Sequence, residues 1–274
     1  MSAEYNSIDA IMKLNNIELF GFCRFENVLP LLPCRAVARV PLNAKTIIMC
    51  AFPYLVKEPS NVKRNISYYA CVPDYHIVVM DMLRNVSNSL KNTFPNYTFE
   101  PFADNSPIRE VKASQLAGLG CVGKNGLLIT KKYGSYVFLG EVVTDMNIDC
   151  TEHNEVCIGC GLCANNCPTK SIGIEGIKED TCLSNITQKK GELLDYEKNL
   201  MVCNHTAWGC DMCQTICPMN KDVAETYIQA FITGANHILT EDNISKKGAY
   251  YWRGRKTIVR NINILNKGID NKKD

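Results

Sequence analysis

The chain has 274 residues, an apolar fraction of 46% and a formal net charge of +2. This composition excludes a disordered chain, and the charge favours neither an acidic nor a basic partner. The unusual feature is the fifteen cysteines, an odd number that disulfide pairing alone cannot use. Most of them fall between positions 157 and 217, many in short, regular spacings. Such spacing indicates metal ligation in a reducing compartment.

No segment resembles an export signal or a membrane span. The start of the chain, Met1 to Asn16, is polar and contains carboxylates. The longest apolar stretch, Thr46 to Val56, is about half the length of a membrane span and is interrupted by Pro53, so it predicts a buried strand instead. We therefore expect a soluble, cytoplasmic protein with neither a membrane nor DNA as a partner.

Hydrophobic periodicity predicts mixed helices and strands up to residue 149. In chain order the expected elements are a short helix around Ile8–Met12, a strand over 46–52, a helix over 74–90, a strand over 97–102, a helix from Ser106 to Gly118, a hairpin of strands over 126–130 and 136–144, and a helix over 222–232. Ser106 and Pro107 are typical of an N-cap and a first helical residue.

The composition divides the chain into three predicted parts, and the overall class is α+β. Residues 1–149 form an α/β domain, residues 150–222 a module folded around metals, and residues 223–274 a helical, basic tail. The basic residues of the tail are Lys246, Lys247, Arg253, Arg255, Lys256, Arg260, Lys267, Lys272 and Lys273. This pattern favours a solvated face over an RNA site.

The strongest motif is a complete C-x2-C-x2-C-x3-C-P run at Cys157, Cys160, Cys163 and Cys167. In such a run the first three thiolates surround one [4Fe–4S] cluster, and the fourth ligates a neighbouring cluster. A zinc site would need only two pairs of cysteines, with a longer separation between the pairs. The run therefore predicts two [4Fe–4S] clusters.

A second run is incomplete. Three cysteines have the spacing that ends the first run: Cys210, Cys213 and Cys217. The position of the missing first cysteine holds Ala207. If the last cysteine of each run crosses over, one cluster has the ligands Cys157, Cys160, Cys163 and Cys217, and the other has Cys167, Cys210 and Cys213. The second cluster then needs one more thiolate, and the candidates are Cys182 and Cys203. We expect the remaining cysteines to be mostly small buried side chains: Cys23, Cys34, Cys50, Cys71, Cys121 and Cys150.

The segment between the two runs, Cys182 to Gly191, resembles the corresponding segment of epoxyqueuosine reductases. There the leading cysteine ligates the second cluster, so the resemblance implies Cys182. It extends over most of residues 45–262, through the stretches Asp74–His76, Asp104 with Pro107, Ala117–Asn125, Leu127–Thr130, Gly134–Glu141 and a basic helix at Arg255–Asn261.

The resemblance implies a nitroreductase-like, cobalamin-binding α/β domain, similar to that of reductive dehalogenases, followed by a ferredoxin-like two-cluster domain. Electrons would pass from a low-potential donor of the flavodoxin or ferredoxin type, through the clusters, to cobalt. Asp104 resembles the residue that donates a proton to the substrate. The residues expected to lie against the corrin are Gly120, Gly123, Lys124, Asn125, Leu128 and Thr130.

Asp104 also has a purely structural interpretation, as a residue at the start of a helix. The helix dipole would then lower its pKa, whereas a general acid near neutral pH needs a raised pKa. The G-x-G-x-x-G sequence from Gly118 to Gly123 follows an expected helix and precedes a strand, which is the reverse of the dinucleotide-binding context. We reject a dinucleotide site there.

Three functions remain open. The first is a cobalamin-dependent reductase that removes oxygen or another leaving group from an organic substrate. The alternatives are an electron-transfer protein without substrate chemistry, and a reductase that acts on the corrinoid of a partner protein. Members of the family continue into a helical-repeat domain that helps to hold transfer RNA, and this sequence ends at Asp274 without one. The substrate is therefore either a small molecule or a modified RNA.

Overall fold

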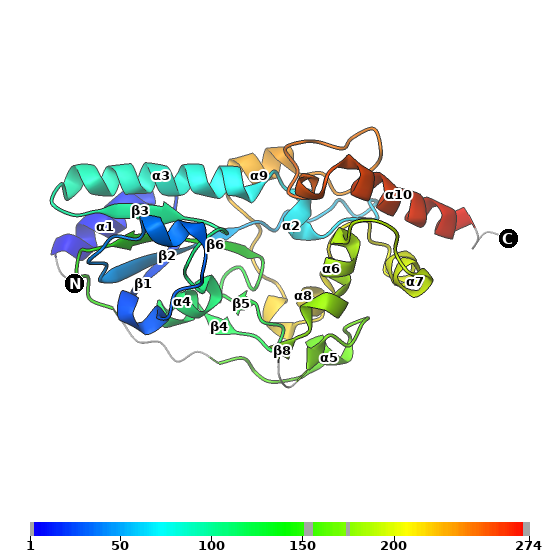
Figure 1. The fold of residues 1–274 in the computed structure, drawn as a ribbon, viewed down its shortest axis with the longest axis horizontal. Helices are drawn as coiled ribbons and strands as arrows, with labels where there is room; N and C mark the ends of the chain where they lie inside the picture. The colour runs from blue at the N-terminus through cyan, green and yellow to red at the C-terminus, as the bar shows by residue number, and fades with distance from the viewer. Residues whose placement is uncertain (1–2, 151–155, 174–175, 271–274) are drawn as a thin grey trace. The chain divides into compact units, whose positions relative to one another are not determined.

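The computed structural model describes residues 3–150, 156–173 and 176–270 (Figure 1). The chain forms two compact units. The first contains Met1–Pro53, Tyr75–Gly123 and Leu127–Ile158, and the second contains Tyr54–Asp74, Lys124–Gly126 and Gly159–Asp274. This division differs from the three predicted parts. The segment Tyr54–Asp74 groups with the second unit through the β-bridge from Ile66 to Trp208, and the expected tail is part of that unit rather than a separate one.

The first unit is built on an antiparallel sheet of strand order β1-β2-β6-β3. Its strands are β1 Leu19–Arg24, β2 Thr46–Pro53, β3 Phe99–Phe102 and β6 Val137–Thr144. Every residue of β2 is buried, because the strand lies inside the sheet and both of its faces are covered. The long apolar run therefore forms a buried strand, as predicted.

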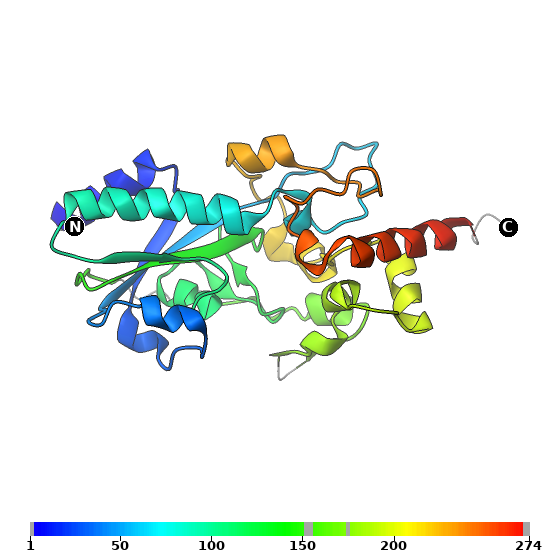
Figure 2. The ribbon, with the colours of Figure 1, turned by 45° about the horizontal axis from the view of Figure 1, so that its top comes forward.

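Helices cover both faces of this sheet (Figure 2). They are α1 Ala3–Leu14, α3 Tyr75–Thr93 and α4 Glu110–Leu116. Helix α3 packs on β3 and β6, and α4 packs on β1, β2 and β6. Gly21 is where α4 comes closest, because a Cβ there would lie 2.0 Å from the carbonyl oxygen of Ala117. Gly21 pairs with Met49, and Met49 pairs with Glu141, so Glu141 faces the α4 side of the sheet.

Three predicted elements are wrong. The apolar runs at 126–130 and 136–144 do not pair with each other, because β5 Leu128–Ile129 pairs with β4 Cys121–Val122 while β6 joins the central sheet. The predicted helix over 222–232 is confined to α9, Gln229–Gly234. Before α9, the backbone N–H of Thr226 donates to the carbonyl of Leu55, which keeps that segment out of a helix.

The predicted N-cap at Ser106 is also wrong, since α4 begins at Glu110. The hydroxyl of Ser106 is already used, because it accepts the N–H of Ile108 and donates to the carboxyl of Glu141. The chain therefore turns once before the helix starts. The other elements agree in place with their predictions, and the basic helix expected from the resemblance is α10, Arg255–Asp270.

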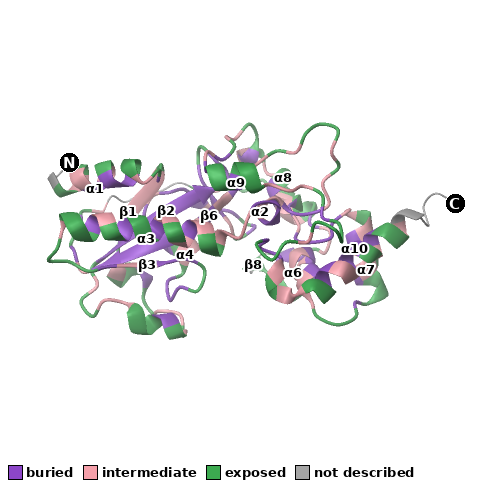
Figure 3. Cartoon of the chain, turned by 90° about the horizontal axis from the view of Figure 1, so that it is seen from above, coloured by how far each residue is buried: buried purple, intermediate pink, exposed green. Residues whose placement is uncertain are grey.

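The second unit has its own core around Trp208. Its elements are α2 Tyr68–Cys71, α5 Leu162–Asn165, β7 Ile172–Gly173, β8 Gly176–Ile177, α6 Leu183–Gln188, α7 Asp195–Cys203, α8 Met212–Thr215, α9 and α10. Short 3-10 turns occur at Phe25–Val28, Arg35–Arg39, Glu179–Thr181, Pro218–Asn220 and Tyr251–Arg253. In α2 the residues Ala70 and Cys71 are buried, and Figure 3 shows α10 with one buried side.

Of the cysteines expected to be small buried side chains, Cys23, Cys50, Cys71 and Cys121 are buried, and Cys34 and Cys150 are partly exposed. The mixed α and β class is confirmed. Lys272 and Lys273 of the basic tail lie outside the described residues. Among the helices that the structure describes, none combines the length and the apolar character that crossing a bilayer requires.

Candidate functional site

Four cysteine thiols of the second unit, those of Cys167, Cys182, Cys210 and Cys213, interact with one another electrostatically. The thiol of Cys210 interacts with those of Cys182 and Cys167, and the thiol of Cys213 interacts with those of Cys210 and Cys182. Burial raises the pKa of both Cys210 and Cys213 to about 12, and the neighbouring thiols add to the shift. Cys203, in contrast, is exposed at the end of α7. The arrangement favours Cys182 as the fourth member of this group.

The sulfur of Cys167 is surrounded by donors. The backbone N–H of Ser171 donates to it over 3.4 Å, and the hydroxyl of Thr169 lies 3.5 Å away. Burial by itself would raise the pKa of this thiol, but the bonds from Thr169, Ser171 and the N–H of Ile172 outweigh it, and the pKa is lowered. Several N–H donors on one sulfur favour the thiolate form, which is the form that ligates metal.

The two cysteine runs lie side by side, since the short helices α5 and α8 that they enclose pack against each other. Cys163 is in α5 and Cys213 is in α8. Within the described residues, no three His, Cys, Asp or Glu side chains stand in metal-coordinating geometry. The thiol chemistry, the N–H donors on Cys167 and the packing of the two runs nevertheless fit [4Fe–4S] clusters.

Position 207 has no access to this group. Ala207 is fully buried in the core of the second unit. Its N–H donates to the carbonyl of Asn65, and its carbonyl accepts from the side chain of Asn261, each over 2.7 Å. Because both backbone groups are fixed inside the core, a side chain at this position faces packed atoms rather than the thiols.

A second polar cluster lies in the first unit, around Asp104. The hydroxyl of Tyr75 lies 3.0 Å from Oδ1 of Asp104, and Nε2 of His76 lies 2.9 Å from Oδ2. Tyr75 is held by stacking on the ring of Phe138, with 4.2 Å between centroids. Asp104 itself has a positive φ of 59°, a backbone conformation that is uncommon for residues other than glycine.

The pKa of Asp104 is lowered from its ordinary value. The hydrogen bond with His76 is the main cause, burial opposes it, and the bond from Tyr75 adds to the lowering. The helix interpretation of this residue is wrong in its detail, because α4 starts six residues later. The carboxylate instead lies against the first residues of α3. Asp104 is therefore ionised near neutral pH and is paired with an imidazole.

Behind Asp104 lie two further carboxyl groups that the sequence analysis did not single out. Glu110 accepts the backbone N–H of Asp104 over 3.2 Å, and Glu141 is fully buried. Burial raises the pKa of Glu110 to about 8, and it raises that of Glu141 well above its ordinary range. A charged residue within the apolar run 136–144 was the signal available in the sequence, because glutamates are almost never fully buried without a partner.

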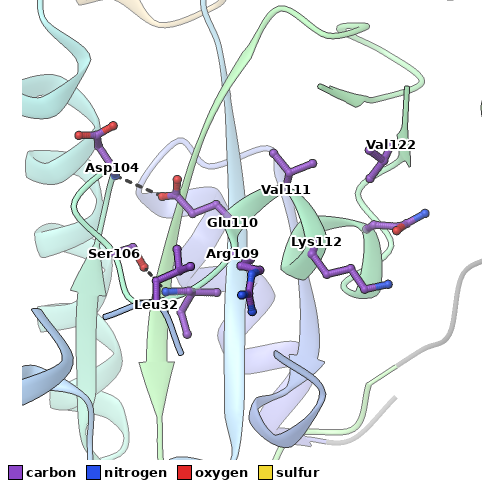
Figure 4. A pocket seen from close by; sticks show the side chains of 10 residues that line it. Leu32, Asp104, Ser106, Arg109, Glu110, Val111, Lys112 and Val122 are labelled. Carbon is purple, nitrogen blue, oxygen red and sulfur yellow. Dashed lines mark hydrogen bonds between the residues drawn. The ribbon is translucent and has the colours of Figure 1, made fainter. Parts of the chain in front are cut away.

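Asp104 and Glu110 border a cavity of about 550 Å³ in the first unit (Figure 4). Its apolar wall consists of Leu32, Ile108, Val111 and Val122. The volume and the mixture of an apolar wall with a few polar groups are typical of a small-molecule site. The cavity therefore can hold a substrate-sized group beside Asp104.

The residues expected against a corrin have other contacts in the described structure. Gly120, Gly123, Leu128 and Thr130 are buried in the first unit, and the hydroxyl of Thr130 donates to the carbonyl of Gly134. The side chain of Asn125, which groups with the second unit, forms a hydrogen bond with Cys213. These six residues form no common exposed surface within either described unit, and Lys124 is the exposed one among the named side chains.

Two known protein families match parts of this chain. Residues 156–220 match a family described as "4Fe-4S double cluster binding domain", and residues 36–105 match "Epoxyqueuosine reductase QueG, DUF1730". The cysteine-rich segment therefore belongs to an iron–sulfur oxidoreductase.

Individual relatives match a larger part of the chain than these two families do. An epoxyqueuosine reductase of Lactococcus garvieae is 32% identical over 243 residues, which cover 80% of this chain and 68% of the relative. One of Synechocystis sp. is 35% identical over 208 residues, which cover 73% and 68% of the two chains. The chain belongs to the epoxyqueuosine reductase family. The matched part is shorter for other members, and spans 54% of the Listeria monocytogenes protein.

Solved structures agree on the fold. The epoxyqueuosine reductase of Streptococcus thermophilus superposes with a TM-score of 0.82 at 24% identity, covering 98% of this chain and 82% of that one. A reductase with an epoxyqueuosine-modified tRNA-Tyr stem loop gives 0.80 at 23% identity, covering 95% and 81%. The Bacillus subtilis enzyme, with its aspartate-bearing catalytic loop swung out of the active site, gives 0.78 at 22% identity, covering 95% and 81%.

The Asp104–His76 contact makes a prediction about pH. In His76→Phe the pKa of Asp104 should rise, because the largest lowering interaction is lost while burial remains. Tyr75→Phe should raise it by less. Since the native pKa lies below the unfolded value, this ionisation stabilises the fold above the unfolded pKa and ceases to do so as the pH falls through the native pKa. His76→Phe should therefore weaken the loss of stability in acid.

Titration of the Asp104 carboxyl carbon by ¹³C NMR in the three proteins measures the shift. An unchanged pKa of Asp104 in His76→Phe would show that the contact with the imidazole contributes nothing.

Proposed function

We propose that this protein is a reductase that uses two [4Fe–4S] clusters and cobalamin to remove oxygen reductively from an epoxyqueuosine-type nucleoside. The observation that carries the proposal is the coexistence of two features in one chain: the interacting thiols around Cys210, and a cavity bordered by Asp104, whose carboxylate is paired with the imidazole of His76. A protein that only transfers electrons needs the cysteine thiols that would hold the clusters. It has no use for a carboxylate–imidazole pair beside a cavity.

The proposed ligand sets are those of crossed runs: Cys157, Cys160, Cys163 and Cys217 for one cluster, and Cys167, Cys182, Cys210 and Cys213 for the other. The interactions among the last four thiols support this assignment. Thiolates must replace thiols when iron binds, so assembly releases protons from residues whose pKa is raised by burial. Bound clusters supply single electrons at low potential.

Cobalamin is proposed from membership of the family, and the described residues fit it in part. The apolar wall of the cavity and the polar pair at its edge suit the face of a large ring that carries a reactive metal. Of the six residues expected to contact it, only Lys124 is exposed. Bound cobalamin would supply a strongly reducing cobalt centre for the substrate.

Removal of an epoxide oxygen consumes two electrons and two protons, and it yields an alkene and water. The electrons come from a low-potential donor of the flavodoxin or ferredoxin type. Because the pKa of Asp104 is lowered, its carboxyl group is ionised near neutral pH and cannot by itself be the source of the proton. We assign that role to Asp104 together with His76 in its protonated form, whose Nε2 lies 2.9 Å from Oδ2 of Asp104.

The substrate is proposed from the relatives, which are named for epoxyqueuosine, and from a structure with a modified tRNA stem loop. The cavity beside Asp104 has room for a nucleoside-sized group. We propose a modified RNA rather than a small organohalide, and a stem loop is the simplest probe of that choice.

The choice between Cys182 and Cys203 is tested by iron content. In Cys182→Ser one cluster should be lost, leaving about four irons per chain, since each cubane holds four. The matched control Cys203→Ser should retain the wild-type content, because the thiols of Cys210 and Cys213 interact with Cys182 and not with Cys203. Iron and acid-labile sulfide in anaerobically reconstituted protein give the measurement. Loss of iron in Cys203→Ser alone would reverse the assignment.

The role of Asp104 is tested by Asp104→Asn, which keeps the shape of the side chain but replaces one carboxylate oxygen with an amide NH₂, so that it cannot take a proton from His76 and pass it on. Turnover of an epoxyqueuosine-containing stem loop with a chemical reductant should fall by about two to four orders of magnitude, with iron and corrinoid retained. Asp81→Asn, an exposed carboxylate on α3, is the control. Equal turnover by Asp104→Asn and the wild type would remove the proton-donor role.

A further inference from the structure

The segment from Asp104 to Glu110 is tied to two carboxyl groups. The N–H of Asp104 donates to Oε1 of Glu110 over 3.2 Å, a bond drawn in Figure 4. The hydroxyl of Ser106 donates to Oε1 of Glu141 on β6, and it accepts the N–H of Ile108 over 3.0 Å. The loop that carries Asp104 is therefore held from the side of the core, while its carboxylate points away from Glu110 (Figure 4).

The two glutamates face each other. Glu141 is 0% exposed, and among the described residues no N–H or O–H donor reaches its Oε2. The carboxyl of Glu110 is hydrogen-bonded to that of Glu141. Two ionised carboxylates can only accept hydrogen bonds. A hydrogen bond between Glu110 and Glu141 therefore requires that one of the two carboxyl groups carries a proton.

Among the described residues, no cation interacts with Glu141 itself, and the imidazole of His76, which interacts with Glu110, only partly offsets the rise in the pKa of that residue. On the face of the sheet that carries Glu141, the nearby titratable group is the thiol of Cys23 on β1, whereas Cys50 on β2 pairs with Gly140 and lies on the opposite face. The titratable groups that face Glu110 are the carboxylate of Asp104 and the imidazole of His76. Burial and the mutual repulsion of the glutamates consequently favour the protonated pair, and the pKa of Glu110 is raised to about 8.

We propose that Glu110 and Glu141 are positioning residues that latch the Asp104 loop through one shared proton. The proton joins Oε2 of Glu141 to Glu110, and Glu110 in turn holds the backbone N–H of Asp104. The latched loop keeps Asp104 at its positive φ of 59°, a conformation that persists only where its surroundings fix it. This inference rests on the proposed function, because it concerns the placement of the proposed proton donor.

The latch depends on pH in a definite direction. A glutamate released to solvent has an ordinary pKa of 4.5, and burial raises the pKa of both latched glutamates above that value. At a pH above the ordinary value and below the raised one, the latched state binds one proton more than the open state, so each pH unit weakens the latch about tenfold.

Amide hydrogen exchange tests the latch in the anaerobically purified full chain, with rates corrected for the intrinsic effect of pH. The protection of the Asp104 amide should fall about tenfold per unit between about pH 6 and pH 8. In Glu141→Gln the amide N–H replaces the shared proton, so protection should persist and lose its pH dependence. Glu110→Gln should behave in the same way, whereas Glu110→Ala should lose protection at every pH.

Glu100→Gln, on the neighbouring strand β3 and paired with Arg39, is the control and should keep the wild-type profile. Protection that is independent of pH in the wild type, or a wild-type slope in both Gln variants, would overturn the proposal. This readout does not use turnover. An inactive protein with the predicted exchange profile would therefore fail the proposed function and keep the latch, and an active protein with a flat wild-type profile would do the reverse.

Discussion

The burial of Trp208 is the constraint on which the second unit depends. The indole is fully buried, its Nε1 donates to the hydroxyl of Tyr69 over 3.0 Å, and its carbonyl accepts the N–H of Ser67 over 2.8 Å. Gly209 follows at a φ of 73°, and a Cβ there would lie 1.9 Å from Oγ of Ser67. The chain thus leaves the core at one defined point, immediately before Cys210.

The same anchor explains why the second cysteine run lacks its first member. Ala207 precedes the indole and is packed in the core, where a thiol cannot reach a cluster. The replacement that the proposed assignment uses, Cys182, immediately precedes α6. Leu183 and Ile186 of that helix pack in the core that contains Trp208. One apolar core therefore positions thiols from two distant parts of the chain. In the second unit, the cysteines proposed as cluster ligands are held in place by the packing of this core.

The sequence predicts features that depend on local pattern and misses those that depend on partners far along the chain. The buried strand β2 and the helix α3 follow from hydrophobic periodicity, and the double-cluster family match agrees with the cysteine spacing. The hairpin after residue 126 fails because β6 pairs with β2, about ninety residues upstream. Ser106 resembles an N-cap, yet its hydroxyl is taken by Glu141. The pairing of Glu110 with Glu141 has no local signature, since neither spacing nor propensity shows that a shared proton is required.

Two [4Fe–4S] clusters held by eight cysteines are the basis of the proposed chemistry. They are tested most directly by determining iron and acid-labile sulfide in anaerobically prepared protein, with electron paramagnetic resonance of the reduced form. We predict about eight irons and eight sulfides per chain, with spin coupling between neighbouring clusters. Two equivalents of zinc with no acid-labile sulfide would contradict this prediction.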